Sequence, residues 1–156
     1  MTPEIRPATA ADAERLDAAL RRLSDELGDP HRADAAALRE AGFGPAPAFR
    51  ALIAEAQGAT VGVVLFSPVF STVRGGPGLY VSDLWVAPEA RSGGLGQRLL
   101  EAARQAAAAA WGARFLRLTV YDDNPRARAF YDRLGFHSDP RETPLAIDFA
   151  PFGDAP

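Results

Sequence analysis

The stretch DLWVAPEARSGGLGQRLL, residues 83–100, decides the fold of this chain. An apolar, β-rich segment ends near Val86, passes through a glycine-containing loop and continues into a segment rich in Leu and Ala, which is typical of a helix. The first turn of a helix leaves backbone N–H groups unpaired at the positive end of the helix dipole, so such a loop favours an anion. Gly94 and Gly96 let the backbone approach a ligand closely, and Arg91 adds a positive charge. The spacing alone leaves an ordinary strand-to-helix turn open as well.

The composition of the chain limits the classes of function. The 156 residues and 47% hydrophobic content suit one domain, and all 17 basic residues are Arg. The absence of Lys excludes a P-loop lysine and a Schiff base, and the absence of Cys excludes a thiolate nucleophile and a cysteine zinc site. A net charge of -3 argues against nucleic acid as a partner and favours a cationic substrate. We expect no metal.

The two histidines, His31 and His137, stand far apart in the sequence, in segments that resemble a loop and a strand edge. We therefore interpret both as polar surface residues. The chain shows neither a signal-peptide pattern nor an apolar run of about 18 residues, which predicts a cytoplasmic protein without a membrane partner.

The periodicity of apolar residues predicts an α/β protein with a mixed sheet. Thr9 and Asp12 resemble a capping box at the start of the first helix. We expect one domain over residues 1–156, with a loose tail at 150–156. The predicted helices cover residues 9–27, 34–41, 95–111 and 125–134, and the predicted strands cover 4–6, 49–56, 60–66, 79–86 and 114–121, with final strands near Phe136 and over 145–149.

A second motif follows at residues 124–136: Asn-x-x-Ala-x-x-Phe-Tyr-x-x-x-Gly-Phe. Alone, its aromatic residues suggest core packing. Together with Arg91-x-x-Gly94-x-Gly96, it resembles the GNAT superfamily of N-acetyltransferases. The resemblance implies the acyl-CoA N-acyltransferase fold, a mostly antiparallel mixed sheet flanked by helices, and acetyl-CoA as cosubstrate.

The resemblance also implies the roles of individual residues. Tyr131 would be the general acid that faces the CoA sulfur, and Asp83 would attract the amine or relay its proton. The implied cofactor-binding residues are Leu84, Trp85 and Val86 on the strand, Arg91, Ser92, Gly93, Gly94, Leu95, Gly96 and Gln97 in the loop, and Asn124, Arg126 and Ala127 in the second motif.

Further similarities, such as Gly42-Phe43-Gly44, resemble the spermidine/spermine and thialysine acetyltransferase branch, whose members usually form homodimers. That branch has two adjacent carboxylates where this chain has Ser82 and Asp83. We therefore expect a small cationic amine, namely a polyamine, a diamine or an amino-acid-like amine, bound by Glu26, Ser82 and Asp83. Two alternatives stay open: a non-catalytic domain that binds or senses acyl-CoA, and an acetyltransferase for protein N-termini or lysines.

Overall fold

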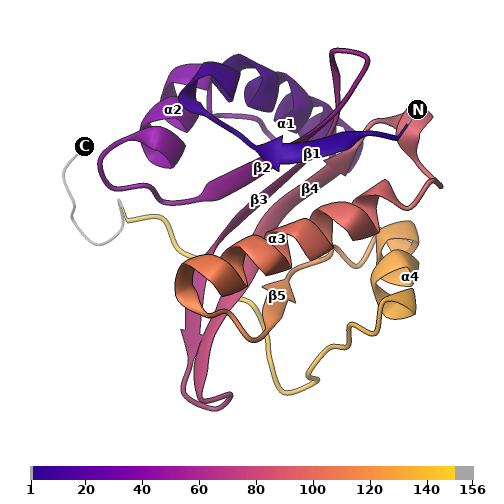
Figure 1. The fold of residues 1–156 in the computed structure, drawn as a ribbon. Helices are drawn as coiled ribbons and strands as arrows, with labels where there is room; N and C mark the ends of the chain where they lie inside the picture. Colours follow the sequence, from indigo (N-terminus) through magenta and orange to yellow (C-terminus); the bar gives the residue numbers. More distant parts are fainter. Residues whose placement is uncertain (1, 150–156) are drawn as a thin grey trace. The chain divides into compact units, whose positions relative to one another are not determined.

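Five strands form one mixed sheet in the computed structural model, which describes residues 2–149. The strands lie in the order of the chain, antiparallel from β1 to β4, whereas β5 runs parallel to β4 (Figure 1). Their bounds are β1 Glu4–Pro7, β2 Arg50–Ala56, β3 Ala59–Ser71, β4 Gly76–Val86 and β5 Leu116–Leu118. The sequence prediction of a mixed, mostly antiparallel sheet is confirmed.

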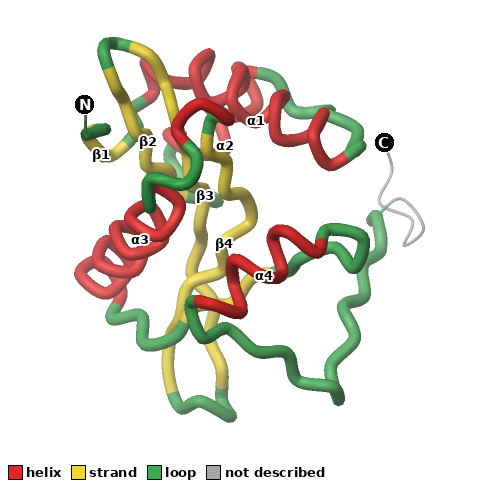
Figure 2. The backbone as a smooth tube through the Cα atoms, turned by 90° about the vertical axis from the view of Figure 1, so that its right-hand side faces the viewer, coloured by secondary structure: helices red, strands yellow, loops and turns green. Residues whose placement is uncertain are grey.

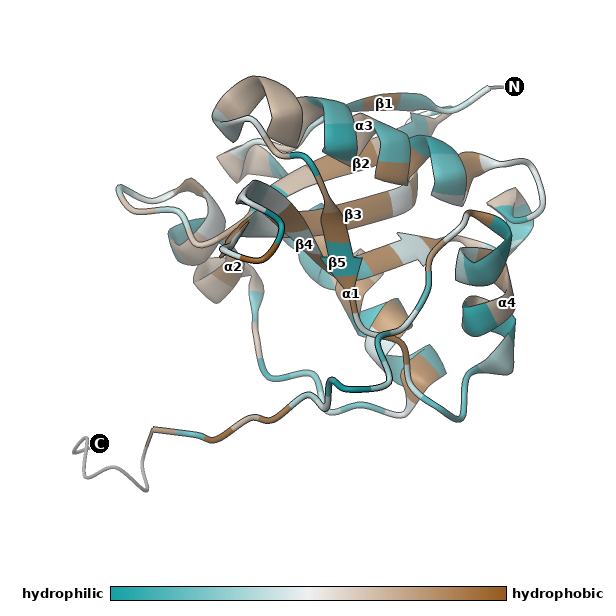
Figure 3. Cartoon of the chain, turned by 90° about the horizontal axis from the view of Figure 1, so that it is seen from below, coloured by the Kyte–Doolittle hydropathy of each residue, from teal (hydrophilic) through white to brown (hydrophobic). Residues whose placement is uncertain are grey.

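The helices of this unit cover the two faces of the sheet. Helix α3 (Leu95–Trp111) packs on one face and α1 (Ala13–Leu27) on the other, with apolar strands between them (Figures 1 and 3). Helix α2 (Ala35–Phe43) packs against α1, and short 3-10 turns, η1 (Ala10–Asp12) and η2 (Pro88–Ala90), precede α1 and α3. The prediction of a helix over 95–111 matches the structure at both ends.

The core lies where the central strand β3 meets α1 and α3. The largest fully buried side chains come from all of these elements and their neighbours: Phe66, Leu16, Ile53, Leu79, Leu99, Val63 and Val64. In α3 the buried residues recur at helical spacing, so one face of the helix is apolar and the opposite face is left to water. The apolar patterning of the sequence therefore fixes which face of each element is buried.

The chain separates into two compact units, residues 1–119 and residues 120–156. The second unit contains one described helix, α4 (Pro125–Arg133), followed by loop up to the last described residue (Figure 2). The single domain over 1–156 stays a prediction, and the loose tail expected at 150–156 lies outside the described residues.

The two strands predicted near Phe136 and over 145–149 are wrong. Both segments are irregular within residues 2–149, and the side chains of Leu145 and Ile147 are 92% and 59% exposed. A strand forms only when another strand accepts its backbone hydrogen bonds, which alternating apolar residues alone do not provide. Strand β5 is also shorter than the predicted 114–121, because its ladder with β4 spans only three residues.

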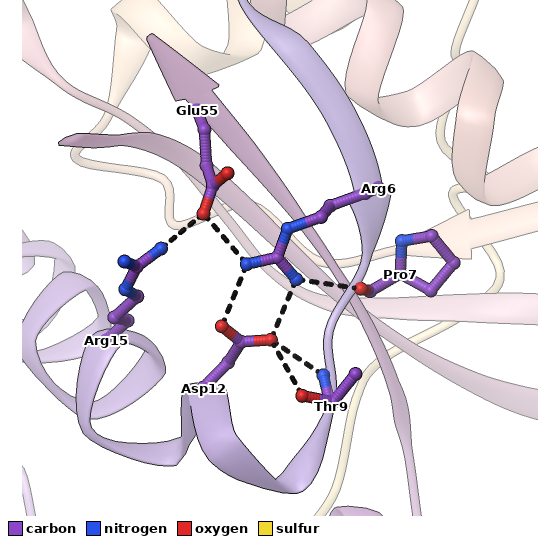
Figure 4. Close-up of polar contacts among 6 residues, drawn as sticks. All are labelled: Arg6, Pro7, Thr9, Asp12, Arg15 and Glu55. Carbon is purple, nitrogen blue, oxygen red and sulfur yellow. Dashed lines mark hydrogen bonds and ion pairs between the residues drawn. The ribbon is translucent and has the colours of Figure 1, made fainter. Parts of the chain in front are cut away.

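A polar cluster ties the start of the chain to the sheet (Figure 4). The guanidinium of Arg6 donates to both oxygens of Asp12, at 2.8 and 2.9 Å, and to Glu55 at 2.8 Å, while Arg15 also pairs with Glu55. Asp12 accepts the Thr9 amide at 2.8 Å, which confirms the predicted capping box. The Arg6 guanidinium holds the pKa of the buried Asp12 carboxyl well below its usual range.

We predict that Asp12→Asn lowers the free energy of unfolding at pH 7 by about 1–3 kcal/mol, because it removes a charge-assisted pair and leaves Arg6 with fewer acceptors. Since the folded-state pKa of Asp12 is depressed, its stabilising effect is present above about pH 4 and is lost as the pH falls through the folded value. Urea unfolding at a series of pH values should show the free energies of unfolding of wild type and variant approaching each other as the pH falls below 4.

Glu14→Gln is the control for this prediction. It neutralises a nearby carboxylate, in the first turn of α1, whose partner Arg39 lies on the surface, where ion pairs contribute little. If Asp12→Asn lowers the free energy of unfolding by no more than Glu14→Gln does, the role given to Asp12 is contradicted.

Candidate functional site

Strand β4 has two neighbours along its first half and one along its second. Its ladder with β5 ends at Val81, opposite Leu118, whereas its ladder with β3 continues to Val86. At the same point the register with β3 shifts, since Asp83 pairs with Leu65 and Val81 with Phe66. Ser82 is therefore an extra residue on β4, a β-bulge. Beyond it, the side of β4 that faced β5 has no strand to pair with.

The backbone of Leu84 and Val86 faces that edge. The Ala87 amide donates to Val61 of β3 at 2.9 Å, and hydrogen-bonding direction alternates along an antiparallel strand. Trp85 therefore bonds toward β3, while Leu84 and Val86 direct their amide and carbonyl groups away from it. The predicted strand contacts thus divide: Leu84 and Val86 present backbone groups, and the side chain of Trp85 is 2% exposed.

The loop after η2 has the backbone of an anion site. Ser92 and Gly94 have φ of +70° and +79°, which is uncommon for a residue with a Cβ such as Ser92. Gly94 caps α3, whose first intrahelical bond runs from the Arg98 amide to the Gly94 carbonyl at 3.0 Å. The amides of the first turn, from Leu95 to Gln97, therefore lack helical acceptors, and the turn carries no acidic residue.

An open groove of about 480 Å³ runs beside this loop. Gly93 and Gly94 line one end, Gln97 and Arg98 follow along α3, and Glu101 lies farther along the helix. The Arg98 guanidinium is held at the groove by the Pro3 carbonyl at 2.8 Å. The groove thus has a cationic side chain beside the glycines that precede α3, which suits an anionic group.

Arg91, expected to contact a ligand, is engaged inside the protein. Its Nε donates to the Val86 carbonyl at 2.9 Å, and its guanidinium pairs with Glu26 at 2.7 Å. The other oxygen of Glu26 accepts from Trp85 Nε1 at 3.3 Å, and Arg22 stacks over the Trp85 ring at 4.8 Å. These contacts join the last turn of α1 to the loop. The roles predicted for Arg91 and Glu26 in binding ligands stay predictions. To contact a ligand, either side chain would have to give up some of these contacts within the protein.

Ser82 and Asp83 lie together at the bulge. Ser82 is exposed and Asp83 is half-buried. Burial raises the pKa of Asp83, while the neighbouring Ser82 side chain and the positive charge of His31 lower it in part. A carboxylate with this burial favours a cationic partner, because an opposite charge offsets the loss of water.

His31 is the residue that sequence reasoning missed. Its Nε2 lies 2.8 Å from Asp17 Oδ1 and its Nδ1 lies 3.2 Å from Ser24 Oγ, and only 11% of its side chain is exposed. The interpretation as a polar surface residue is therefore wrong for His31. Asp17 and Ser24 share one face of α1 at a seven-residue spacing, the only sequence signal that points to this arrangement.

In the second unit, two residues of the predicted motif bind each other. Asn124 caps α4, accepting the Ala127 amide through Oδ1 at 3.1 Å, while Arg126 is exposed. Tyr131 packs edge-to-face against Phe130 and Phe136, with ring centroids 5.1 and 5.4 Å away. Burial raises the pKa of Tyr131 to about 12, so its hydroxyl stays protonated at neutral pH.

Residues 2–149 contain no group of three or more side chains of the His, Cys, Asp and Glu types arranged to hold a metal ion. Among the helices that the structure describes, none has the length and apolar character needed to cross a membrane.

Comparison with known proteins places this geometry in a family. The model of the acetyltransferase (GNAT) family matches residues 16–136. Thialysine N-epsilon-acetyltransferase of Bos taurus is 33% identical over 141 residues, which cover 84% of this chain and 82% of the relative. An integron cassette protein from the mobile metagenome of V. cholerae has a similar structure, with a TM-score of 0.80, 18% identity and 99% of both chains covered. Aminoglycoside N-acetyltransferase AAC(6')-Iy, solved in complex with CoA, gives a TM-score of 0.75 at 21% identity, covering 93% of this chain and 94% of the other. The chain belongs to the acetyltransferase (GNAT) family and is an acyltransferase enzyme.

Proposed function

We propose that the enzyme transfers an acetyl group from acetyl-CoA directly to the amine of a small cationic molecule, such as a polyamine, a diamine or an amino-acid-like amine. One observation carries the proposal. The left-handed turn at Ser92 and Gly94, which starts α3, closely follows the part of β4 that has no strand partner on the β5 side. A pyrophosphate and an amide-containing arm need these two kinds of backbone groups, placed one after the other.

The residues present fit the acetyl donor. The amides from Ser92 to Gln97 would hold the pyrophosphate, since first-turn N–H groups and the helix dipole both favour an anion. The outward backbone groups of Leu84 and Val86 would pair with the amides of the pantetheine arm. Support comes from a neighbour of this fold that is described in complex with CoA. The predicted contacts of Asn124, Arg126 and Ala127 belong to the same proposal.

Asp83 supports a cationic acceptor. Its half-buried carboxyl lies on the bulge of β4, one residue before the proposed pantetheine contacts, so a cation bound there lies beside the thioester. A relative of similar length is named a thialysine acetyltransferase. Because Ser82 replaces a second carboxylate, we propose an acceptor with fewer positive charges than a long polyamine.

Direct transfer suits the chemistry of the chain. The amine attacks the thioester, so no protein nucleophile is needed and the absence of Cys is no obstacle. Tyr131, whose hydroxyl stays protonated at neutral pH, would supply the proton to the departing thiolate. A non-catalytic sensor would have no use for such an acid.

Two further predictions accompany this function. A homodimer and a cytoplasmic location both come from resemblance and composition, and both stay predictions. The exposed apolar side chains of Leu145 and Ile147 are compatible with pairing of two copies.

The acceptor prediction is tested by CoA release across four classes: polyamines and diamines, lysine analogues, aminoglycosides, and peptides with a free N-terminus. A thiol reagent reports CoA without background, because the protein has no Cys. We expect the highest kcat/KM for a small amine with one or two charges. Preference for a peptide would instead favour a protein acetyltransferase, and CoA binding without turnover of any amine would favour a sensor.

The donor prediction is tested by Gly94→Ala with Gly112→Ala as its match. Both glycines are caps of α3 with positive φ, +79° and +72°, and a Cβ at either meets no atom within 4 Å. Each substitution should therefore cost about 1–2 kcal/mol of stability through left-handed strain alone. Calorimetry should show at least a tenfold weaker affinity for CoA in Gly94→Ala, a loss of about 1.4 kcal/mol, and no change in Gly112→Ala. Equal affinities in the two variants would place the donor elsewhere.

Tyr131→Phe should lower kcat by about 100-fold or more, because positioned acid catalysis contributes a factor of that order, while CoA affinity changes little. Tyr80→Phe is the control, since it removes a phenol whose hydroxyl meets Thr119 Oγ1 at 3.2 Å. Single-turnover rates exclude an effect of product release. If Tyr131→Phe keeps the wild-type single-turnover rate, Tyr131 serves only to pack against Phe130 and Phe136.

A further inference from the structure

We infer that His31, held by Asp17, is the group that takes up the proton of the acceptor amine. The inference rests on the proposed function and adds to it a residue outside both family motifs. It also separates two tasks that the sequence assigned to one carboxyl, since Asp83 then attracts the cation and His31 removes its proton.

The contacts of His31 fix the tautomer of its ring. Asp17 is a carboxylate at neutral pH, with a lowered pKa, so the Nε2 atom 2.8 Å from it carries the proton and donates. The lone pair of the neutral ring is then on Nδ1, which accepts from the Ser24 hydroxyl at 3.2 Å. A histidine oriented by a carboxylate at one nitrogen, with a lone pair at the other, has the arrangement of a proton acceptor.

The charged groups around His31 favour this role. Asp17 and, through Asp17, Arg21 face it from α1, and Asp83 interacts with it electrostatically from β4. When His31 gains a proton, the new imidazolium is stabilised by its direct contact with the Asp17 carboxylate and by the electrostatic interaction with Asp83. Imidazole is also the side chain whose ordinary pKa lies nearest neutral pH, where a carboxylate such as Asp83 is a weak base.

Each proton in the proposed transfer has a donor and an acceptor. The ammonium loses one proton, which passes through the Ser24 hydroxyl or a water in its place to His31 Nδ1, and the free nitrogen lone pair forms the bond to the acetyl carbon. The bond from carbon to sulfur breaks, and the sulfur leaves as a thiolate that takes a proton from Tyr131 or from solvent. As the bond to sulfur breaks, the nitrogen gives up a second proton, which passes through solvent and restores the Tyr131 hydroxyl. The imidazolium then returns its proton to water, and the nitrogen of the product is a neutral amide.

His31→Gln tests the inference, with His137→Gln as the matched control. Because these are the only two histidines, the pair of variants assigns any histidine effect to one residue. We expect kcat in His31→Gln to fall about 100-fold or more at pH 7, and the bend that a basic group gives to the pH profile of kcat/KM to disappear. His137→Gln should keep both the rate and the bend.

The Michaelis constant provides a second readout. Below the bend the imidazolium repels a cationic acceptor, so the KM for the amine should rise as the pH falls in wild type and stay flat in His31→Gln. CoA affinity should remain unchanged in both variants, because His31 lies outside the donor loop. A wild type that acetylates no amine overturns the proposed function itself, whereas an active wild type with the same pH profile as His31→Gln overturns this inference alone.

NMR titration of the imidazole protons tests the Asp17 contact without turnover and without His31→Gln having to fold. In His137→Gln the remaining histidine signal belongs to His31. Adding Asp17→Asn should move its titration to lower pH, because an amide no longer stabilises the imidazolium, and should move the bend in kcat/KM in the same direction. A signal that titrates identically with and without the Asp17 carboxylate contradicts the geometry on which the inference depends.

Discussion

The site depends on one constraint: strand β4 loses a neighbour at Val81 while it keeps the other as far as Val86. Backbone amides and carbonyls that leave a sheet need other partners, because an unsatisfied polar group away from water is costly. In this chain Arg91 meets the Val86 carbonyl, and the backbone of Leu84 remains directed at the same edge. The open edge is therefore a break in the hydrogen bonding of the sheet that leaves backbone groups of β4 available to a ligand.

Two electrostatic systems surround this edge, and they act at different places. Around the loop, the contacts of Arg91 with Glu26 and Val86 hold the turn that starts α3 against the end of α1. Around the bulge, Asp83 and His31 lie within electrostatic reach of each other, with Asp17 behind the histidine. The first system preserves a backbone conformation, and the second brings one imidazole into interaction with two carboxylates.

Local patterns in the sequence predicted what depends on local structure. The helix over 95–111 has its stop signal at Gly112, and the loop before it is recognisable from glycines at fixed spacing. The extra residue at Ser82 was not predictable, because a bulge is defined by pairing with a strand some 17 positions earlier in the chain. A deletion or insertion in β4 on either side of Ser82 would turn the following side chains to the opposite face, whereas a substitution at Ser82 leaves their order intact.

Contacts between distant segments explain the other differences between the sequence predictions and the structure. His31 looked like a surface residue because its partners Asp17 and Ser24 lie on a different element, and only the packing of the loop after α1 brings them together. Arg91 and Glu26 are 65 residues apart and looked like separate ligand contacts. At residues 145–149 the apolar side chains suggested a strand, but apolar residues specify the faces of a strand and not the partner strand that it needs.

Every ion pair that the described residues form uses Arg or His as its cation, because the chain contains no Lys. A guanidinium stays protonated at any physiological pH, while an ε-amine can lose its charge by acylation. An enzyme that handles a reactive thioester exposes its own amines to that donor throughout its lifetime. Because the charged contacts of this chain are built from Arg, they are chemically inert toward an acyl thioester, so neither Asp12 nor Glu26 can lose its partner through acylation.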